Sequence, residues 1–291
     1  MNTVTKRSLI GVVIVLLIAA GLAFAGSWGG HTVSGFPLYA LCILLAFAIQ
    51  WVAFVPAYLR QTEAFFDLTG GLTYTLVLIV AATLSPSMDV RSWLVFSIIL
   101  IWAIRLASFL FMRIHTAGED RRFREIKPSF ARFLLTWTLQ GLWVSFSVAA
   151  GLAVITSTVR VGLDAFAIVG FMVWLIGFAI EVIADRQKSA FNANPANKGK
   201  FIHTGLWAWS RHPNYFGEIV LWIGVAIIAL PVLRGWQWAT LISPIFIILL
   251  LTRISGVPLL EKRADEKWGG QPDYEAYKAG TSVLVPMPPK K

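Results

Sequence analysis

The sequence predicts an all-α, polytopic membrane protein of about eight transmembrane helices. Of its 291 residues, 57% are hydrophobic and only 14% are charged. A soluble domain carries about a quarter charged residues, so much of this surface is expected to face lipid. The apolar residues also fall into long runs, and the basic residues gather between alternate runs. These three observations together indicate a chain that crosses a membrane several times.

Each apolar run is long enough, or nearly so, to span a bilayer. A spanning helix needs about 20 apolar residues to cross about 30 Å of hydrocarbon. Lipid also requires backbone polar groups to bond within the segment, which favours helices. The first run could be a signal peptide, but its length favours a retained span. The third is short and can be completed by residues from 65 onward. The runs are 8–26, 37–59, 70–84, 91–113, 131–156, 163–188, 214–233 and 236–256.

The distribution of Lys and Arg predicts the orientation. With both termini in the cytoplasm, 21 basic residues lie in cytoplasmic segments and three, Arg91, Arg160 and Arg234, on the opposite side. This asymmetry follows the positive-inside rule. The net charge of +10 is therefore explained by topology, and a nucleic-acid partner is not expected.

Several familiar site types are missing from the sequence. The single cysteine, Cys42, excludes a disulfide framework and argues against a Cys-based metal site. The four histidines show no metal-ligand spacing, so no metal is expected. There is also no Gly-rich dinucleotide fingerprint, P-loop or His-Glu-x-x-His zinc helix. Any nucleotide must therefore bind between helices.

Ionisable residues inside the predicted spans are few, and such residues mark function by default. Arg105 lies eight residues inside the fourth run, about 12 Å by helical rise. A buried Arg needs carboxylate or phosphate partners, either in a structural ion pair or on a ligand. Glu181 and Asp185 are four residues apart near the inner end of the sixth run. They therefore share one helix face.

The densest polar segment runs from Asp185 to Glu218. Pro213 suits the first turn of the seventh helix, where its missing N–H is not needed. A helix start flanked by Arg211 and His212 favours an anion such as phosphate or carboxylate. The alternative interpretation is an interfacial loop with an aromatic belt, formed by Trp207, Trp209 and Tyr215.

These segments belong to a wider pattern, which covers about residues 102–286. Its parts are Glu181-x-x-x-Asp185-x-Gln187-Lys188-x-x-Phe191, Gly205-Leu206-Trp207, Ser210-Arg211-His212-Pro213-Asn214-Tyr215-Phe216-Gly217-Glu218, Arg253-x-Ser255-Gly256-Val257-Pro258-x-x-Glu261 and Tyr274-x-x-Tyr277. The pattern resembles the steroid 5-alpha-reductase superfamily, and more closely its bacterial branch of uncharacterised membrane proteins.

The resemblance implies a reductase-like membrane domain over residues 31–291, preceded by an additional helix over residues 1–30. Seven core helices would enclose NADPH at the cytoplasmic side of a bacterial inner membrane. The implied reaction is reduction of a carbon–carbon double bond conjugated to a carbonyl, in a sterol, isoprenoid or lipid. Hydride would come from NADPH, while a polar group donates a hydrogen bond to the carbonyl oxygen. The implied partners are this lipophilic substrate and membrane lipid, with the oligomeric state left open.

The resemblance also implies a set of cofactor-binding residues. Asp185 and Asn214 would contact ribose, amide or phosphate groups, and Arg105 and Arg253 would pair with phosphates. The full set is Arg105, Arg113, Glu181, Asp185, Lys188, Arg211, His212, Asn214, Tyr215 and Arg253.

The catalytic end matches the family less closely. Steroid reductases use an adjacent Gln-Glu pair and a Tyr at the substrate carbonyl. The nearest counterpart here is Gln61-Thr62-Glu63, and Trp102 aligns with the Tyr. Because Trp donates one N–H and is not an acid, Tyr74 is a further candidate. The resemblance therefore implies ene-reduction, with Gln61, Glu63, Tyr74 and Trp102 as candidates, and leaves activity on 3-keto steroids open.

Two other classes compete with the reductase. Isoprenylcysteine carboxyl and phospholipid methyltransferases share the Arg-His-Pro-x-Tyr pattern and use S-adenosylmethionine. They continue with an adjacent acidic pair in the last helix, whereas here Glu261 is followed by Lys262. A transporter would be expected to show internal repeats and helices broken at the midplane. Neither is evident, and the polar residues gather at one face, so the reductase is favoured.

Overall fold

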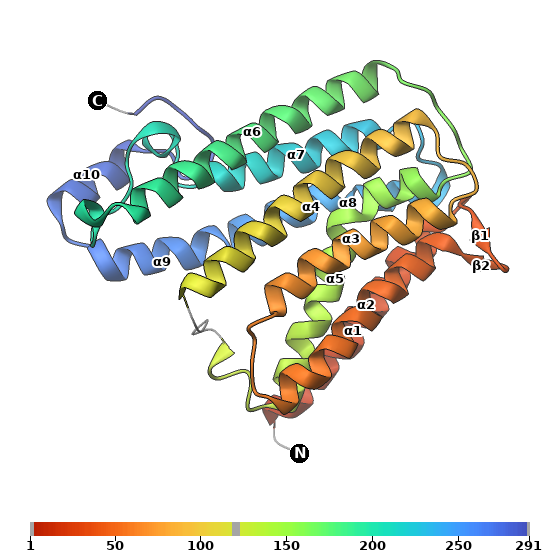
Figure 1. The fold of residues 1–291 in the computed structure, drawn as a ribbon, viewed down its shortest axis with the longest axis horizontal. Coiled ribbons are helices and arrows are strands. Elements are labelled where there is room, and N and C mark those ends of the chain that lie inside the picture. The colour runs from red at the N-terminus through yellow and green to blue at the C-terminus, as the bar shows by residue number, and fades with distance from the viewer. Residues whose placement is uncertain (1–2, 118–122, 290–291) are drawn as a thin grey trace. The chain divides into compact units, whose positions relative to one another are not determined.

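Long helices make up most of the computed structural model (Figure 1). The structure describes residues 3–117 and 123–289, with side chains for 3–108 and 123–289. The only sheet in this described part is a two-stranded antiparallel hairpin, β1 Thr32–Val33 and β2 Phe36–Pro37. The seven longest α-helices of this described part are α1 Thr3–Gly26, α2 Leu38–Leu59, α3 Phe66–Leu84, α4 Val90–Ala117, α5 Phe130–Thr156, α6 Ala165–Ala193 and α7 Pro213–Ala229.

The prediction of an all-α polytopic membrane protein is confirmed. In the described residues, seven helical segments are long and apolar enough to cross a bilayer. An eighth apolar helix, α7, is shorter, with 17 residues. The third helix begins at Phe66, as the completed third run required.

The last predicted span, 236–256, is not one regular helix. It begins as a 3-10 helix over Gly235–Leu241, continues as α8 Ile242–Leu249, and ends in a π-helical turn over Leu250–Ile254. Two helices follow it, α9 Val257–Trp268 and α10 Pro272–Gly280. Pro258 in the first turn of α9 has no N–H for a continuous helix, which accounts for the break at Gly256.

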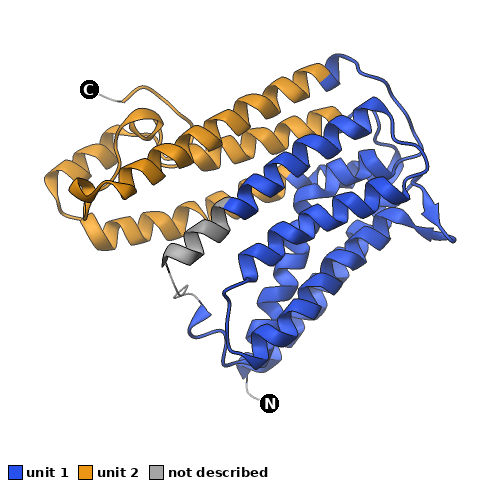
Figure 2. Cartoon of the chain, viewed as in Figure 1, with its two compact units in different colours: residues 1–167, 229–243 blue, residues 168–228, 244–291 orange. Residues whose placement is uncertain are grey.

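Two compact units divide the chain (Figure 2). Unit 1 comprises residues 1–167 and 229–243, and unit 2 comprises residues 168–228 and 244–291. In unit 1, α5 packs against α1, α2, α3 and α4, and it is buried along most of its length. The helix α1 packs on α5 and on the 3-10 helix, so it shares a unit with the helices that follow it. The predicted separation of residues 1–30 from 31–291 stays a prediction.

Two arginines hold together the loops at one end of unit 1. The guanidinium of Arg160 donates to the hydroxyls of Ser85 and Ser92 at 3.3 and 3.1 Å. It also lies 3.1 Å from Nε2 of His31. Nearby, Arg91 is fully buried and pairs with Asp164 at 2.6 Å. These contacts join three loops at the end of unit 1 that the sequence predicts to lie on the side opposite the cytoplasm.

In unit 2, α6 and α7 run antiparallel with their backbones in direct contact. A Cβ atom on Gly177 would lie 2.6 Å from the carbonyl oxygen of Gly217. One on Gly170 would lie 2.7 Å from the carbonyl oxygen of Gly224. Small residues at such positions allow membrane helices to approach closely. This contact sets the α6 residue Glu181 beside Gly217, where a Cβ would meet the Glu181 nitrogen at 2.6 Å.

Candidate functional site

The start of α7 is fastened to the C-terminal tail. The hydroxyl of Ser210 accepts a hydrogen bond from the backbone N–H of His212 at 3.1 Å and donates one to the carbonyl of Leu284 at 2.8 Å. The backbone N–H of Arg211 donates to the carbonyl of Ser282 at 2.8 Å. These bonds hold the chain just before α7 begins. The helix then starts at Pro213, where a missing N–H leaves no helical hydrogen bond unmade.

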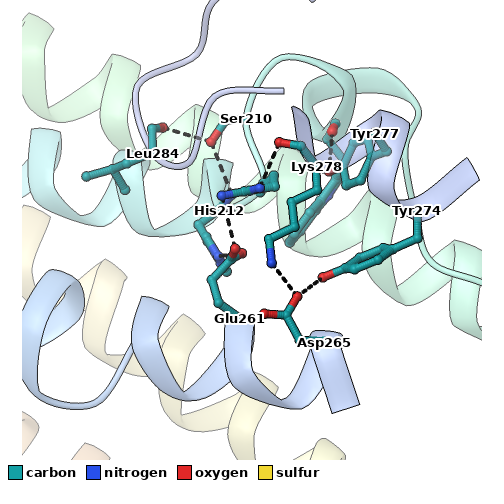
Figure 3. A network of polar contacts seen from close by, with 10 residues as sticks. Ser210, His212, Glu261, Asp265, Tyr274, Tyr277, Lys278 and Leu284 are labelled. Carbon is teal, nitrogen blue, oxygen red and sulfur yellow. Dashed lines mark hydrogen bonds and ion pairs between the residues drawn. The ribbon is translucent and has the colours of Figure 1, made fainter. Parts of the chain in front are cut away.

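Glu261 of α9 joins the two basic residues at this helix start (Figure 3). Its Oε1 atom lies 2.8 Å from Nε2 of His212, and its Oε2 atom lies 3.0 Å from Arg211. A carboxylate only accepts hydrogen bonds, so the Nε2 atom of His212 carries a hydrogen. The His212 ring also stacks on Tyr215, with centroids 5.7 Å apart. Arg211 and His212 are therefore held by a protein carboxylate.

A second carboxylate lies one turn further along α9. Asp265 accepts a hydrogen bond from the hydroxyl of Tyr274 at 2.9 Å and pairs with Lys278 (Figure 3). Burial, followed by the hydrogen bond to Asp265, raises the pKa of Tyr274 above its usual value. Burial likewise raises the pKa of Tyr277, whose hydroxyl donates to the carbonyl of Trp207. Both phenols are therefore protonated donors at neutral pH.

The loop before α7 is also bound to the end of α6. The indole of Trp207 donates to the carbonyl of Ala184 at 3.0 Å, and Gln187 accepts from the N–H of Leu206 at 3.0 Å. The ammonium of Lys188 lies 4.5 Å from the centre of the Trp207 ring. The aromatic residue therefore packs inside unit 2, whereas Trp209 is exposed. The aromatic-belt interpretation does not describe Trp207.

Asp185 and Asn214 meet between α6 and α7. The Nδ2 atom of Asn214 donates to Oδ1 of Asp185 at 3.2 Å, and Asp185 and Glu181 are both buried. Because a carboxylate accepts only, this bond fixes the amide orientation and leaves Oδ1 of Asn214 as an acceptor.

Three polar atoms at the start of α7 are buried without a hydrogen-bond partner in the described part of the chain. They are Oδ1 of Asn214, Nδ1 of His212 and Nε of Arg211. Leaving such a group unpaired costs about 1–3 kcal/mol. Unmet hydrogen-bonding capacity in a native structure points to an unplaced water, ion or ligand. Among the three atoms, Nε of Arg211 is a donor and Oδ1 of Asn214 is an acceptor.

Unit 2 brings several of the predicted cofactor residues together, but not all of them. Arg253 is exposed and lies in the π-helical turn. Arg105 is in α4 of unit 1, whereas Asp185 and Asn214 are in unit 2. The side chain of Arg113 lies outside the described residues. The convergence of these arginines with the Asp185–Asn214 pair stays a prediction.

The predicted catalytic residues lie in unit 1 and fall into two groups. The rings of Tyr74 and Trp102 are buried and meet edge to face, with centroids 5.2 Å apart. Gln61 is exposed in a turn with φ of 50°, and its amide donates to the carbonyl of Tyr58. Glu63 pairs with Lys127 at 2.6 Å. The aromatic pair is in the helical core, and the other two residues belong to a connecting segment.

Sequence reasoning left Glu261, Asp265 and Lys278 out of the site. A usable signal was present, because Glu261 and Asp265 are four residues apart, as are Tyr274 and Lys278. Residues at this spacing share one helix face. The structure shows these two faces meeting.

As for metals, no group of three or more potential ligand side chains gathers among residues 3–108 and 123–289.

Comparison with known proteins gives a family and one partial relative. A 58-residue stretch is 34% identical to a Ustilaginoidea virens protein named "Probable O-methyltransferase ustE". This stretch covers 20% of the chain and about a fifth of that relative. No solved structure matches the chain. Residues 53–281, which include every helix from the end of α2 to α10, match a family described as "Protein of unknown function (DUF1295)". The chain belongs to the DUF1295 family.

Proposed function

We propose that the protein is a membrane enzyme that binds NADPH where α6 meets α7 and reduces a carbon–carbon double bond conjugated to a carbonyl in a lipophilic substrate. The observation that carries the proposal is the buried Asp185–Asn214 pair, with further polar atoms at the start of α7 that have unmet hydrogen-bonding capacity. A bound group that completes these atoms would explain why they are buried without partners.

The residues present fit a nicotinamide nucleotide. Asp185 would accept hydrogen bonds from ribose hydroxyls, and Oδ1 of Asn214 would accept from a ribose hydroxyl or a carboxamide. Unit 2 carries twelve Lys and Arg against eight Asp and Glu, an excess that favours a polyanionic ligand. When bound, NADPH supplies the hydride, and the protein supplies orientation and exclusion of water.

The family supports the same class of reaction. DUF1295 is linked to steroid 5-alpha-reductase-like proteins. The motifs that carry this resemblance, including Asp185 and Asn214, fall inside the matched range 53–281. This link is the support that the family gives to a reductase as the first candidate.

A methyltransferase that uses S-adenosylmethionine is the second candidate. The partial relative carries an O-methyltransferase name, and this favours it. The buried carboxylates of Glu181 and Asp185 would also suit a cationic sulfonium and its amino group. The two candidates require cofactors of opposite charge, so binding separates them.

Thermal unfolding of the detergent-solubilised full chain tests the choice. A ligand that binds only the folded state at 100 times its Kd stabilises it by about 2.7 kcal/mol. We expect NADPH to raise the unfolding temperature and S-adenosylmethionine to leave it unchanged. The reverse result would replace the reductase with the methyltransferase, and no response to either cofactor would contradict both.

A further inference from the structure

A pocket of about 280 Å³ opens on the surface of unit 2, apart from the α6–α7 site. Its walls come from the loop before α7, from α10 and from the C-terminal tail. The residues that line it include neither the Asp185–Asn214 pair nor Arg211 and His212. Sites for small molecules usually measure about 300–1,000 Å³, so this pocket suits a ligand at the small end of that range.

Three aromatic rings line the pocket. Phe201 and His203 belong to the loop, and Tyr277 belongs to α10. The centre of the Phe201 ring lies 5.3 Å from that of Tyr277 and 5.5 Å from that of His203. The hydroxyl of Tyr277 donates to the carbonyl of Trp207 at 2.7 Å. This bond occupies the polar end of Tyr277, so the ring rather than the hydroxyl is available to a ligand.

One carboxylate gives the pocket its charge. Asp273, in the first turn of α10, lines the pocket, and no Lys or Arg is among the described residues that line it. Glu261 and Asp265 of the neighbouring α9 are paired with basic side chains. Asp273, in contrast, makes no ion pair with the described residues, and its Oδ1 atom accepts from the backbone N–H of Tyr274. Its negative charge is therefore left for a ligand.

Rings and a carboxylate together favour an organic cation. The face of an aromatic ring attracts an ammonium group that lies within about 6 Å of the ring centre. The carboxylate of Asp273 attracts the same charge, whereas an anion would meet it with no basic group in the walls to compensate. A metal ion such as Ca²⁺ takes about six to eight oxygen ligands, but the pocket offers a single carboxylate. A methylated ammonium carries both a positive charge and an apolar surface that rings can cover.

We propose that this pocket binds the positive group of a small organic ammonium compound through the carboxylate of Asp273 and the rings of Phe201, His203 and Tyr277. A soluble cation and a lipid headgroup both carry this group, and competition separates the two sources. The proposal goes beyond the proposed function and does not depend on it, because the pocket shares no residue with the Asp185–Asn214 pair.

Two probes of one shape test the charge. In 3,3-dimethylbutan-1-ol a carbon atom replaces the positive nitrogen of choline, and the rest of the molecule is the same. Each probe would be titrated against the full chain in dodecyl maltoside, an uncharged detergent, and followed by ligand-observed NMR with empty micelles as the blank. We expect choline to bind at least tenfold more tightly than the alcohol. Equal binding of the two probes would overturn the proposal.

Two acidic residues of α10 allow a matched comparison of variants. Asp273 and Glu275 both lie in the first turn of the helix and are exposed, but only Asp273 lines the pocket. Asp273→Asn should weaken choline binding at least tenfold, whereas the control Glu275→Gln should bind choline as the wild-type protein does. Each substitution removes one negative charge from the same helix end. Equal choline affinities of the two variants would therefore contradict direct binding by Asp273.

Phe201→Leu tests the rings. Leucine keeps an apolar side chain but has no aromatic face. A cation–π contact at an exposed site changes affinity by about two- to fivefold, so we expect a loss of that size for choline and none for the alcohol. Phe201 also packs against Trp268 and Tyr274, so the unfolding temperature of the variant is measured first. A folded Phe201→Leu protein that binds choline as tightly as the wild type would contradict the part given to the rings.

Competition by lipids identifies the source of the ammonium group. Phosphatidylcholine added to the micelles should weaken choline binding if a lipid headgroup enters the pocket, and should leave it unchanged if the ligand is soluble. Phosphatidylglycerol, which has no ammonium group, is the control lipid and should have no effect. An equal loss of choline binding with both lipids would contradict recognition of the ammonium group.

Discussion

Asn214 donates a hydrogen bond to Asp185 across two helices whose backbones touch at Gly177 and Gly217. The bond is 3.2 Å long and joins an amide to a buried carboxylate. Hydrogen bonds to a charged group are stronger than those between neutral groups. The pair forms because the glycines let α6 and α7 approach closely, so the geometry of the candidate site depends on residues that carry no side chain.

Replacing Gly217 by Ala should disrupt this geometry. The new Cβ would lie 2.6 Å from both the Glu181 nitrogen and the Gly177 oxygen, so the helices must separate. Overpacking of this kind costs about 1–3 kcal/mol. We expect a lower unfolding temperature and weaker NADPH binding, measured by thermal unfolding and titration. Gly21→Ala in α1 is the control, because nothing lies within 4 Å of its Cβ. Equal unfolding temperatures for the two variants would refute the close contact.

Glu261→Gln should loosen the start of α7. The substitution keeps the size of the side chain but removes the charge that holds Arg211 and His212. Losing hydrogen bonds between charged, partly buried groups costs about 1–3 kcal/mol. Thermal unfolding would show the difference against Glu266→Gln, a control on the same helix. Glu266 pairs only at the surface with Lys262, 3.9 Å away, and is expected to contribute about 0.3–0.5 kcal/mol. Equal effects would show that Glu261 has no special role.

The sequence predicts the helices well because length and hydropathy are local properties. The apolar run 37–59 corresponds to α2 Leu38–Leu59 almost residue for residue. The π-helical turn before Gly256 was not predicted, because the 236–256 run is uniformly apolar and its break follows from Pro258 beyond it. Hydropathy carries no information about where such a run changes its hydrogen-bonding pattern.

The site was predicted only in part, for a similar reason. Asp185 and Asn214 were placed together by resemblance to a family, and the structure shows them in contact. The contact of His212 with Glu261 joins residues 49 positions apart. Long-range pairing of this kind depends on how α7 and α9 pack, which one sequence does not reveal.

The contact of His31 with Arg160 should make stability depend on pH. Burial, followed by the charge of Arg160, lowers the pKa of His31. The fold therefore favours the neutral ring, whose Nε2 accepts from the guanidinium. This contribution is fully present above the unfolded pKa of about 6.5 and is lost as the pH falls through the folded pKa.

A pH series of unfolding temperatures measures this effect. The wild-type protein should lose stability as the pH falls below about 6.5. His31→Gln keeps an acceptor for Arg160 but does not titrate, so its unfolding temperature should fall less. If the unfolding temperatures of the two proteins fall equally with pH, His31 is not the cause of the pH dependence.

Asp164→Asn should destabilise the same end of unit 1. The backbone N–H of Ala167, followed by the buried Arg91, lowers the pKa of Asp164. The ionised form is therefore favoured in the fold, and its contribution is lost as the pH falls through this lowered pKa. Without the charge, Arg91 still donates to the carbonyls of Val161 and Gly162 but loses its ion pair with residue 164. The unfolding temperature at pH 7 should fall more than for the exposed control Asp273→Asn, and an equal or smaller fall would contradict the pairing.

The most direct measurement is the Kd of NADPH for the wild-type protein, Asn214→Ala and the exposed control Asn192→Ala. If the Asp185–Asn214 pair contacts the cofactor, Asn214→Ala should weaken binding at least tenfold, or about 1.4 kcal/mol. Asn192→Ala, on α6 but in an exposed position, should bind as the wild type does. Unchanged affinity in Asn214→Ala, or no measurable NADPH binding by the wild-type protein, would contradict the central claim.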